Sequence, residues 1–177
     1  QAEEPYSFLV YGDSRSYPED HEKVVDAMQL EEGQFVLHSG DLVEIPLLQG
    51  DWDDYFTVAS PLMQLRPYVP IFGNHEAFGG VTPFRKYFNT PDHADGYVSM
   101  FSFQYGNVFF IMMDILTNYA VDSPQYDWVV GQLELAASIP SVKHCVVMSH
   151  FPPYSASNHG EDFDVKKFRN AYVPLFE

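Results

Sequence analysis

Cysteine, basic residues and long apolar runs are all scarce in this sequence. A single cysteine, Cys145, excludes an internal disulfide, so cysteine usage does not identify the compartment. The longest strongly apolar run, residues 108–113, is far too short to span a bilayer. The sequence therefore excludes a disulfide-stapled scaffold, and we expect no membrane insertion.

Positive charge is scarce in a way that limits the partners of the protein. Nine Lys and Arg residues stand against 25 Asp and Glu residues, which gives a formal net charge of −16. Nonspecific binding to nucleic acid or to an anionic membrane needs a basic surface, so we expect neither. The acidity most simply serves solubility. An anionic substrate would need local positive charge, and bound metal is its simplest source.

Apolar residues, by contrast, are plentiful. They make up 46% of the 177 residues, and aromatic residues make up 16%, which is enough for a sizeable core. We therefore expect one globular domain over residues 1–177. The chain begins with Gln1, which fits a mature protein after signal removal or a chain trimmed at its start. We favour the former, which predicts a secreted or periplasmic protein.

Four short apolar stretches each end in a polar residue that can bind metal. The residues that follow these stretches are Asp13, Asp41, the pair Asn74 and His75, and His150. The stretches are predicted strands, and they cover residues 6–12, 34–39, 68–72 and 143–149. Functional groups of α/β proteins lie at the carboxyl ends of strands, so this repeated design predicts a ligand set.

Helical patterns alternate with these strands at both ends of the chain. Helices are expected over residues 18–30, from an Asp51 cap with a kink or restart at Pro61, over residues 124–137, and from Val165. Residues 79–95 are expected to be irregular. Two β-rich runs, residues 97–105 and 108–113, flank a Gly-Asn pair and predict a hairpin. The alternation favours a layered α/β sandwich with a mixed sheet.

The C-terminal segment ends without the usual signals of a helix stop. Residues 165–177 have helical spacing, with Phe168, Tyr172 and Phe176 on one side. No glycine cap and no polar tail follow them. We therefore expect the fold to be incomplete at its C-terminal end.

The residue types in the predicted ligand set indicate which metals the site would take. Oxygen ligands with a few imidazoles suit divalent or trivalent Mn, Fe or Zn. An aspartate between two such ions can bridge them. Paired metals roughly 3.5–4 Å apart activate a water and stabilise an in-line displacement at phosphorus. The residue types thus predict a centre for Mn, Fe or Zn ions.

Taken in order, the motifs resemble those of a known family. The set Gly12-Asp13, Gly40-Asp41, Gly73-Asn74-His75-Glu76 and His150 resembles the calcineurin-like metallophosphoesterases, and within them the purple-acid-phosphatase-like branch, over residues 6–177. The resemblance implies an α/β/β/α sandwich with mixed sheets. It also implies an enzyme that hydrolyses a phosphomonoester or phosphodiester with a hydroxide bound to two metal ions.

The resemblance also implies a role for each matching residue. Asp13 matches a ligand of the first metal, Asp41 the bridging carboxylate, and Asn74 with His150 the ligands of the second metal. His75 matches the histidine that contacts the phosphate and helps the leaving group depart. A further substrate-facing histidine matches His159, although a loop histidine of this kind is usually exposed and idle.

Two positions depart from the family pattern. Arg15 stands where many members have a histidine, and it either binds the substrate phosphate or forms a surface ion pair. Glu44 stands where purple acid phosphatases have a tyrosine ligand, and it is either a replacement carboxylate or a loop residue.

His38, one residue from the second Gly-Asp turn, is either a support for the ligands or a packing residue.

A larger departure is a missing motif. The family closes its site with a Gly-His-x-His motif that gives one histidine to each metal, and no Gly-His dipeptide occurs in this sequence. We expect the chain to be truncated before these ligands, with its metals incompletely bound. The alternative to an enzyme is therefore an inactive or partner-binding fragment of the same fold, and a third possibility is that another chain completes the site.

Overall fold

The protein forms two compact units that are best described separately. A computed structural model describes residues 5–91, 96–114 and 116–177. Close contacts group the described residues up to 90 into an N-terminal unit and those from 91 to 177 into a C-terminal unit. The expectation of one domain over residues 1–177 stays a prediction.

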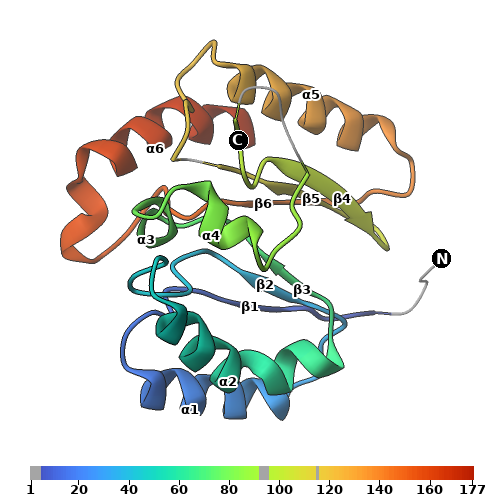
Figure 1. The fold of residues 1–177 in the computed structure, drawn as a ribbon. Helices are drawn as coiled ribbons and strands as arrows, with labels where there is room; N and C mark the ends of the chain where they lie inside the picture. The colour runs from blue at the N-terminus through green and yellow to red at the C-terminus, as the bar shows by residue number, and fades with distance from the viewer. Residues whose placement is uncertain (1–4, 92–95, 115) are drawn as a thin grey trace. The chain divides into compact units, whose positions relative to one another are not determined.

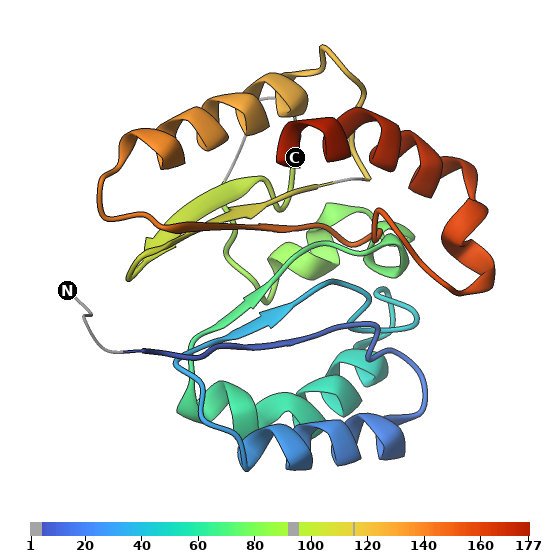
Figure 2. The ribbon, with the colours of Figure 1, turned by 180° about the vertical axis from the view of Figure 1, so that it is seen from behind.

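The N-terminal unit is built on a parallel sheet with the strand order β1-β2-β3 (Figure 1). Leu37 in the central strand pairs with Val10 on one side and Val69 on the other. Helices α1 and α2 cover one face of this sheet, and the short α3 and α4 lie on its other side (Figures 1 and 2). The elements are β1 (Leu9–Tyr11), α1 (Pro18–Gln29), β2 (Val36–His38), α2 (Gln49–Leu65), β3 (Tyr68–Pro70), α3 (Asn74–Ala77) and α4 (Val81–Arg85).

Helix α2 differs from its prediction at both points that the sequence singled out. It begins at Gln49, and the Asp51 carboxylate accepts the backbone N–H of Ile45 at 2.8 Å, so Asp51 is not the helix cap. The helix also continues through Pro61 without a restart. Proline lacks an N–H, and the carbonyl of Thr57 accepts instead from the hydroxyl of Ser60 at 3.3 Å. A side-chain hydrogen bond thus replaces the missing backbone one.

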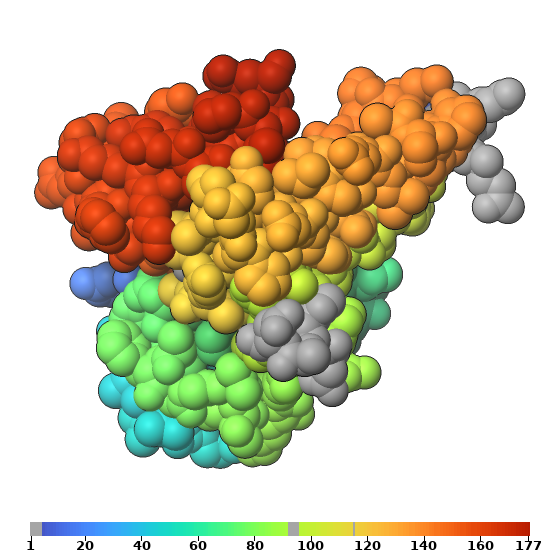
Figure 3. All heavy atoms as spheres, turned by 90° about the horizontal axis from the view of Figure 1, so that it is seen from above, coloured from blue at the N-terminus to red at the C-terminus, as the bar shows by residue number. Residues whose placement is uncertain are grey.

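The C-terminal unit contains a mixed sheet with the order β4-β5-β6. Strands β4 (Phe101–Tyr105) and β5 (Val108–Met112) form the predicted antiparallel hairpin, and β6 (His144–Met148) pairs parallel to β5. Helices α5 (Pro124–Ser138) and α6 (Phe163–Phe176) cover one face of this sheet (Figures 1 and 2), and the 3₁₀ turn η1 (Asn158–Glu161) precedes α6. Their outer surface is visible in Figure 3, with α5 in orange and α6 in red.

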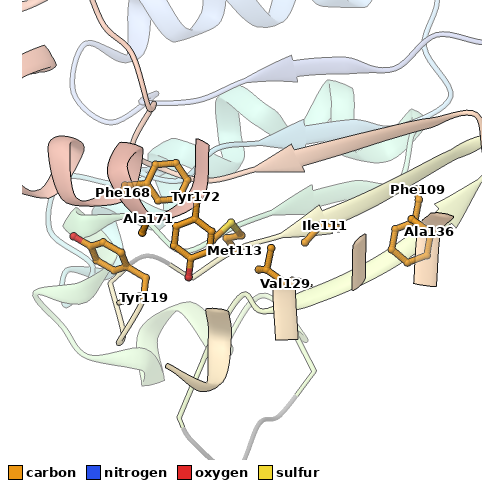
Figure 4. Packing of buried hydrophobic residues seen from close by; sticks show 9 residues of the cluster. All are labelled: Phe109, Ile111, Met113, Tyr119, Val129, Ala136, Phe168, Ala171 and Tyr172. Carbon is orange, nitrogen blue, oxygen red and sulfur yellow. The ribbon is translucent and has the colours of Figure 1, made fainter. Parts of the chain in front are cut away.

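Side chains from β5, α5 and α6 form the core of the C-terminal unit (Figure 4). Ile111 and Val129 are fully buried and join β5 to α5. Phe168 and Tyr172 bring in α6, as their helical spacing predicted, with ring centroids 5.1 Å apart. Burial of these aromatic rings stabilises the packing of α6 on the sheet.

The fold class predicted from the sequence is confirmed. One sheet is parallel and the other mixed, with helices packed on both. The predicted strand over residues 97–105 is shorter than expected and begins at Phe101, and the last helix begins at Phe163 and not at Val165. Within the described residues, no helix is both long and apolar enough to cross a membrane.

Candidate metal centre

The loops that follow β1, β2 and β3 meet at one edge of the N-terminal sheet because the three strands are parallel. These loops carry Asp13, Asp41 and Asn74. Two backbone hydrogen bonds join the first loop to the second: Asp13 N–H donates to the carbonyl of Gly40 at 3.0 Å, and Arg15 N–H donates to that of Asp41 at 3.1 Å. Three of the predicted ligands are therefore placed by the sheet itself.

Asp13 and Asp41 share an unusual backbone conformation. Their φ angles are 53° and 58°, in the left-handed region that non-glycine residues seldom adopt. Holding a residue there costs of order 1–3 kcal/mol, and such residues cluster at functional sites. The two Gly-Asp motifs therefore share a backbone conformation at the aspartate.

Arg15 joins the two carboxylates. Its Nη1 lies 2.6 Å from Oδ1 of Asp13 and 3.1 Å from Oδ2 of Asp41, and its Nε lies 3.6 Å from Oε2 of Glu44. The Asp41 side chain is 1% exposed, whereas that of Asp13 is 61% exposed. A single guanidinium thus offsets part of the negative charge of three carboxylates, one of which is buried.

Glu44 belongs to the same charged group. The hydroxyl of Ser16 donates to its Oε2 at 2.5 Å. This hydrogen bond, followed by the charges of His75 and Arg15, lowers the pKa of Glu44. Glu44 is therefore held ionised at the rim of the site, and its alternative role as a metal ligand stays open.

His75 is fixed at both its backbone and its ring. Its backbone N–H donates to Oδ1 of Asp41 at 2.9 Å, and its Nδ1 lies 3.0 Å from the carbonyl oxygen of Glu44. Because a carbonyl only accepts, Nδ1 carries the hydrogen, and Nε2 is the nitrogen left to exchange a proton. The edge of the ring packs against Phe78, with centroids 5.5 Å apart.

Glu76 has a structural role that the sequence reading did not assign. Its side chain is fully buried and accepts four backbone N–H groups: Asp41 at 2.8 Å, Leu42 at 2.8 Å, Val43 at 3.2 Å and Gly73 at 3.0 Å. Burial raises the pKa of Glu76, and the N–H groups oppose that rise. The acid directly after Asn74-His75 was the available signal, since it ties the loop after β3 to the loop after β2.

A second buried link joins the loops after β1 and β2. His38 is fully buried, its Nδ1 accepts the N–H of Gly40 at 3.2 Å, and its Nε2 lies 2.9 Å from Oγ of Ser14. Since Nδ1 accepts, Nε2–H donates to the serine. These contacts support the interpretation of His38 as a residue that positions the ligands.

The remaining predicted residues belong to the C-terminal unit. His150 follows β6, is buried, and packs its ring 5.3 Å from that of Phe151. His159 lies in η1 with its side chain 81% exposed, and its Nδ1 is 2.8 Å from Oδ2 of Asp162. Their roles stay predictions.

Asp114, at the end of β5, is a buried aspartate of the C-terminal unit with a structural function. Its carboxylate accepts the backbone N–H groups of Val98 at 2.7 Å and Leu116 at 3.1 Å. The side-chain amide of Gln125 accepts the backbone N–H of Asp114 at 2.8 Å and donates to its carbonyl at 2.6 Å. Asp114 therefore anchors the chain around the end of β5.

The oxygen donors of the N-terminal unit fit a metal centre. The carboxylates of Asp13 and Asp41 converge on one cationic nitrogen, and the side-chain amide of Asn74 stands at the start of α3. Mn, Fe and Zn accept donors of these types. Across the part of the chain that the structure describes, no group of three or more His, Cys, Asp or Glu side chains is arranged to hold an ion. The types of donor fit these metals, but the two carboxylates are drawn together around Arg15 and not around an ion-binding position.

Comparisons with known proteins show the family of this chain. The family model for calcineurin-like phosphoesterases matches residues 6–174. "Fe(3+)-Zn(2+) purple acid phosphatase 12" of Arabidopsis thaliana is 26% identical over 170 residues, which are 88% of this chain and 36% of that protein. "Probable inactive purple acid phosphatase 9" of the same plant is 23% identical over 175 residues, covering 81% of this chain and 27% of that protein.

A solved structure shows the same fold. The purple acid phosphatase isolated from yellow lupin (Lupinus luteus) seeds superposes with a TM-score of 0.73 at 16% identity, over 93% of this chain and 35% of that one. The chain thus spans about a third of the length of the relatives that it matches. From the order of its motifs, its strand-end aspartates and the match over residues 6–174, this chain belongs to the calcineurin-like phosphoesterase family, and its relatives include purple acid phosphatases.

Proposed function

We propose that this chain carries the catalytic machinery of a metal-dependent phosphatase that hydrolyses a phosphomonoester or phosphodiester. The observation that carries the proposal is the meeting of Asp13 and Asp41 on one cation, with His75 hydrogen-bonded to Asp41. Two carboxylates that share a positive charge can share metal ions in the same way. A histidine fixed beside them can serve proton transfer.

Asp13, Asp41 and Asn74 would hold the metals, with His150 as a further ligand. Two divalent or trivalent ions, of Mn, Fe or Zn, would supply an activated water and neutralise charge on the phosphate. The strained, well-bonded loops support this role because they fix the oxygens before an ion arrives.

Arg15 and His75 would act on the substrate. With Asp13 and Asp41 bound to metal, the Arg15 guanidinium would be able to donate hydrogen bonds to the phosphate oxygens of the substrate. His75 Nε2, with Nδ1–H held by the Glu44 carbonyl, would protonate the leaving oxygen. His159 would assist from the C-terminal unit.

The experiment that tests this function is a metal-dependent hydrolysis assay. The chain would be supplied with Mn, Fe or Zn and assayed with 4-nitrophenyl phosphate and bis(4-nitrophenyl) phosphate. We expect Asp41→Asn and His75→Ala each to lower kcat/KM about 100-fold or more. His144→Ala, an exposed histidine on β6, is the matched control and should leave the rate unchanged. Full hydrolysis by both site variants would disprove the mechanism.

A second candidate is an inactive or partner-binding module of the same fold. The pairing of Arg15 with both aspartates favours it, since a guanidinium can replace an ion as the stabilising charge. One relative is itself named as probably inactive, which supports the second candidate. Metal content by mass spectrometry separates the two: about two equivalents per chain together with turnover exclude the module, whereas none or one without turnover excludes the enzyme.

The net charge supports a further part of the proposal. A chain with 25 acidic and nine basic residues should not bind nucleic acid, which a gel-shift assay at low salt would check. We also propose a secreted or periplasmic location and a single folding domain. One cooperative unfolding transition seen by both fluorescence and circular dichroism would support the latter.

A further inference from the structure

We propose that a pocket of the N-terminal unit binds the organic group of the ester, an aromatic or flat apolar group that carries an additional negative charge. This inference rests on the proposed function and names a substrate class for the same site. The pocket has a volume of about 690 Å³ and is formed by the loop before α2, the start of α2, and α4. A space of this size suits an aromatic group of one or two rings.

The walls of this pocket are apolar and aromatic. Leu47 is 69% exposed and Val81 is 37% exposed, so both present apolar surface that the fold leaves uncovered. Trp52 is buried, and its Nε1–H donates to the carbonyl of Pro46 at 2.8 Å. Its ring lies 4.7 Å from that of Tyr87. The two rings give the pocket a rigid aromatic side, which favours flat apolar ligands.

The charge of the pocket is opposite to that of the protein. Arg85 and Lys86, two of only nine basic residues, line it, and none of its lining residues is acidic. Lys86 Nζ donates to Oε1 of Gln49 at 2.7 Å and, among the described residues, makes no ion pair. Its charge is therefore available to a bound anion, held in place by a neutral side chain.

A neighbouring cavity of the same unit shows that this charge is not general. That cavity, of about 190 Å³, is lined by three acids, Glu44, Asp51 and Asp54, together with Arg15. An anionic ligand would be repelled there by the surplus of carboxylates. Of these two cavities, only the larger combines apolar walls with a net positive lining.

The pocket begins next to His75. The carbonyl of Glu44 holds the His75 ring at 3.0 Å, and Pro46, which lines the pocket, is only two residues further, at most about 7 Å along the chain. From the other side, α3 ends at Ala77, two residues before Gly79, which also lines the pocket, and a Cβ on Gly79 would lie 3.0 Å from Pro46. A leaving group protonated by His75 therefore has the pocket within reach.

The test measures binding of 2-naphthoate, which combines a flat apolar group with a carboxylate, by titration calorimetry without metal. We expect Leu47→Asp to weaken binding about tenfold or more, because it removes apolar surface and adds a repelling charge. Lys86→Met should weaken it about fivefold, as expected for loss of one partly exposed ion pair. The neutral 2-naphthamide should bind more weakly than 2-naphthoate to the unmodified chain, and this difference should be smaller in Lys86→Met, in which Arg85 is the remaining basic residue of the pocket.

Matched controls separate the pocket from surface effects. Leu65→Asp changes an exposed leucine at the end of α2, away from the pocket lining, and Lys23→Met changes an exposed lysine of α1. Both control variants should bind 2-naphthoate as tightly as the unmodified chain does. Absence of naphthoate binding, or equal binding by the pocket variants and the controls, would overturn the proposal.

The same samples keep this inference distinct from the proposed function. Hydrolysis of 4-nitrophenyl phosphate without naphthoate binding overturns the pocket and leaves the phosphatase in place. Naphthoate binding that depends on Leu47 and Lys86, but without any hydrolysis, overturns the phosphatase and retains an anion-binding apolar pocket. Where both hold, the phosphate ester of 6-hydroxy-2-naphthoate should show a KM that rises in Lys86→Met relative to that of Lys23→Met.

Discussion

The carboxylate of Glu76 accepts the backbone N–H of Asp41 at 2.8 Å, and this bond ties the residue after His75 to the proposed bridging ligand. The two residues lie 35 positions apart in the sequence. Their contact joins the loop after β2 to the loop after β3, so a substitution in one loop should alter the stability of the other.

Glu76→Gln should lower the free energy of unfolding by about 2–4 kcal/mol. An amide keeps one acceptor oxygen but turns an NH₂ group toward backbone N–H donors, which leaves buried donors unpaired. Urea unfolding followed by fluorescence measures this, with Glu22→Gln on the exposed face of α1 as a control that should change by less than about 0.5 kcal/mol. Equal stability of the two variants would argue against the clamp.

Gly73→Ala should be severely destabilising and should also weaken metal binding. A Cβ at this position would overlap the backbone N and Oδ1 of Asp41 and would lie 2.7 Å from Oε2 of Glu76. We expect a loss of about 2–4 kcal/mol. Gly50→Ala is the control, because its Cβ would meet no atom within 4 Å and should stabilise α2 by about 0.5–1 kcal/mol. Thermal unfolding of both variants checks the opposite signs.

His38 and Ser14 should be coupled energetically. Their side chains lie 2.9 Å apart in a bond that joins the first two ligand loops. A double-mutant cycle of His38→Leu and Ser14→Ala should give a coupling of about 1 kcal/mol in the free energy of unfolding. Strict additivity of the two changes would mean that this contact contributes nothing to the link.

Arg15→Gln should increase affinity for divalent metal. The guanidinium competes with an ion for the carboxylates of Asp13 and Asp41, so its removal frees both for metal and restores their negative field. Calorimetric titration with Mn should show binding about tenfold tighter than in the Arg169→Gln control, whose arginine lies in α6 of the other unit. Weaker metal binding in Arg15→Gln would show that Arg15 organises the ligands and does not compete for them.

The stability of the fold should fall between neutral pH and pH 4 because of His21. Burial lowers the pKa of His21 to about 4, from an ordinary value of 6.5. The unfolded chain therefore binds a proton at His21 in this window and the folded chain does not, so stability is full above pH 6.5 and is lost as the pH falls towards 4.

His21→Phe isolates this contribution. It keeps a ring beside Tyr55, whose centroid lies 5.6 Å from that of His21, and removes the titrating group. Urea unfolding at pH 7 and pH 5 should show the unmodified chain losing about 1 kcal/mol more than the variant, after allowance for partial contact with water. The carboxylates titrate alike in both proteins, so an equal loss would contradict the prediction.

Local sequence patterns predicted much of the fold. The Gly-Asn pair placed the hairpin of β4 and β5, and the Ser-Pro pair placed the start of α5, where the Ser123 hydroxyl accepts the N–H of Tyr126. The start of α2 was wrong because the Asp51 side chain is used by the loop before the helix. Capping preferences are local, whereas the partner of a side chain is settled by the loop that packs on it.

The candidate metal site was likewise predicted only in part by local sequence patterns. Apolar runs that end in Gly-Asp or Gly-Asn-His, and the order of those motifs, by themselves determined the fold class, the family resemblance and the candidate ligands Asp13, Asp41 and Asn74. Only the tertiary structure decided that Arg15 holds both aspartates, that Glu76 ties the loop of Asp41 to the loop after β3, and that Pro46, two residues after Glu44, lines an apolar pocket with basic residues. The reason is physical: strand periodicity and turn preferences act over a few residues, whereas charge pairing and burial depend on residues that the parallel sheet brings together from about 30 positions apart.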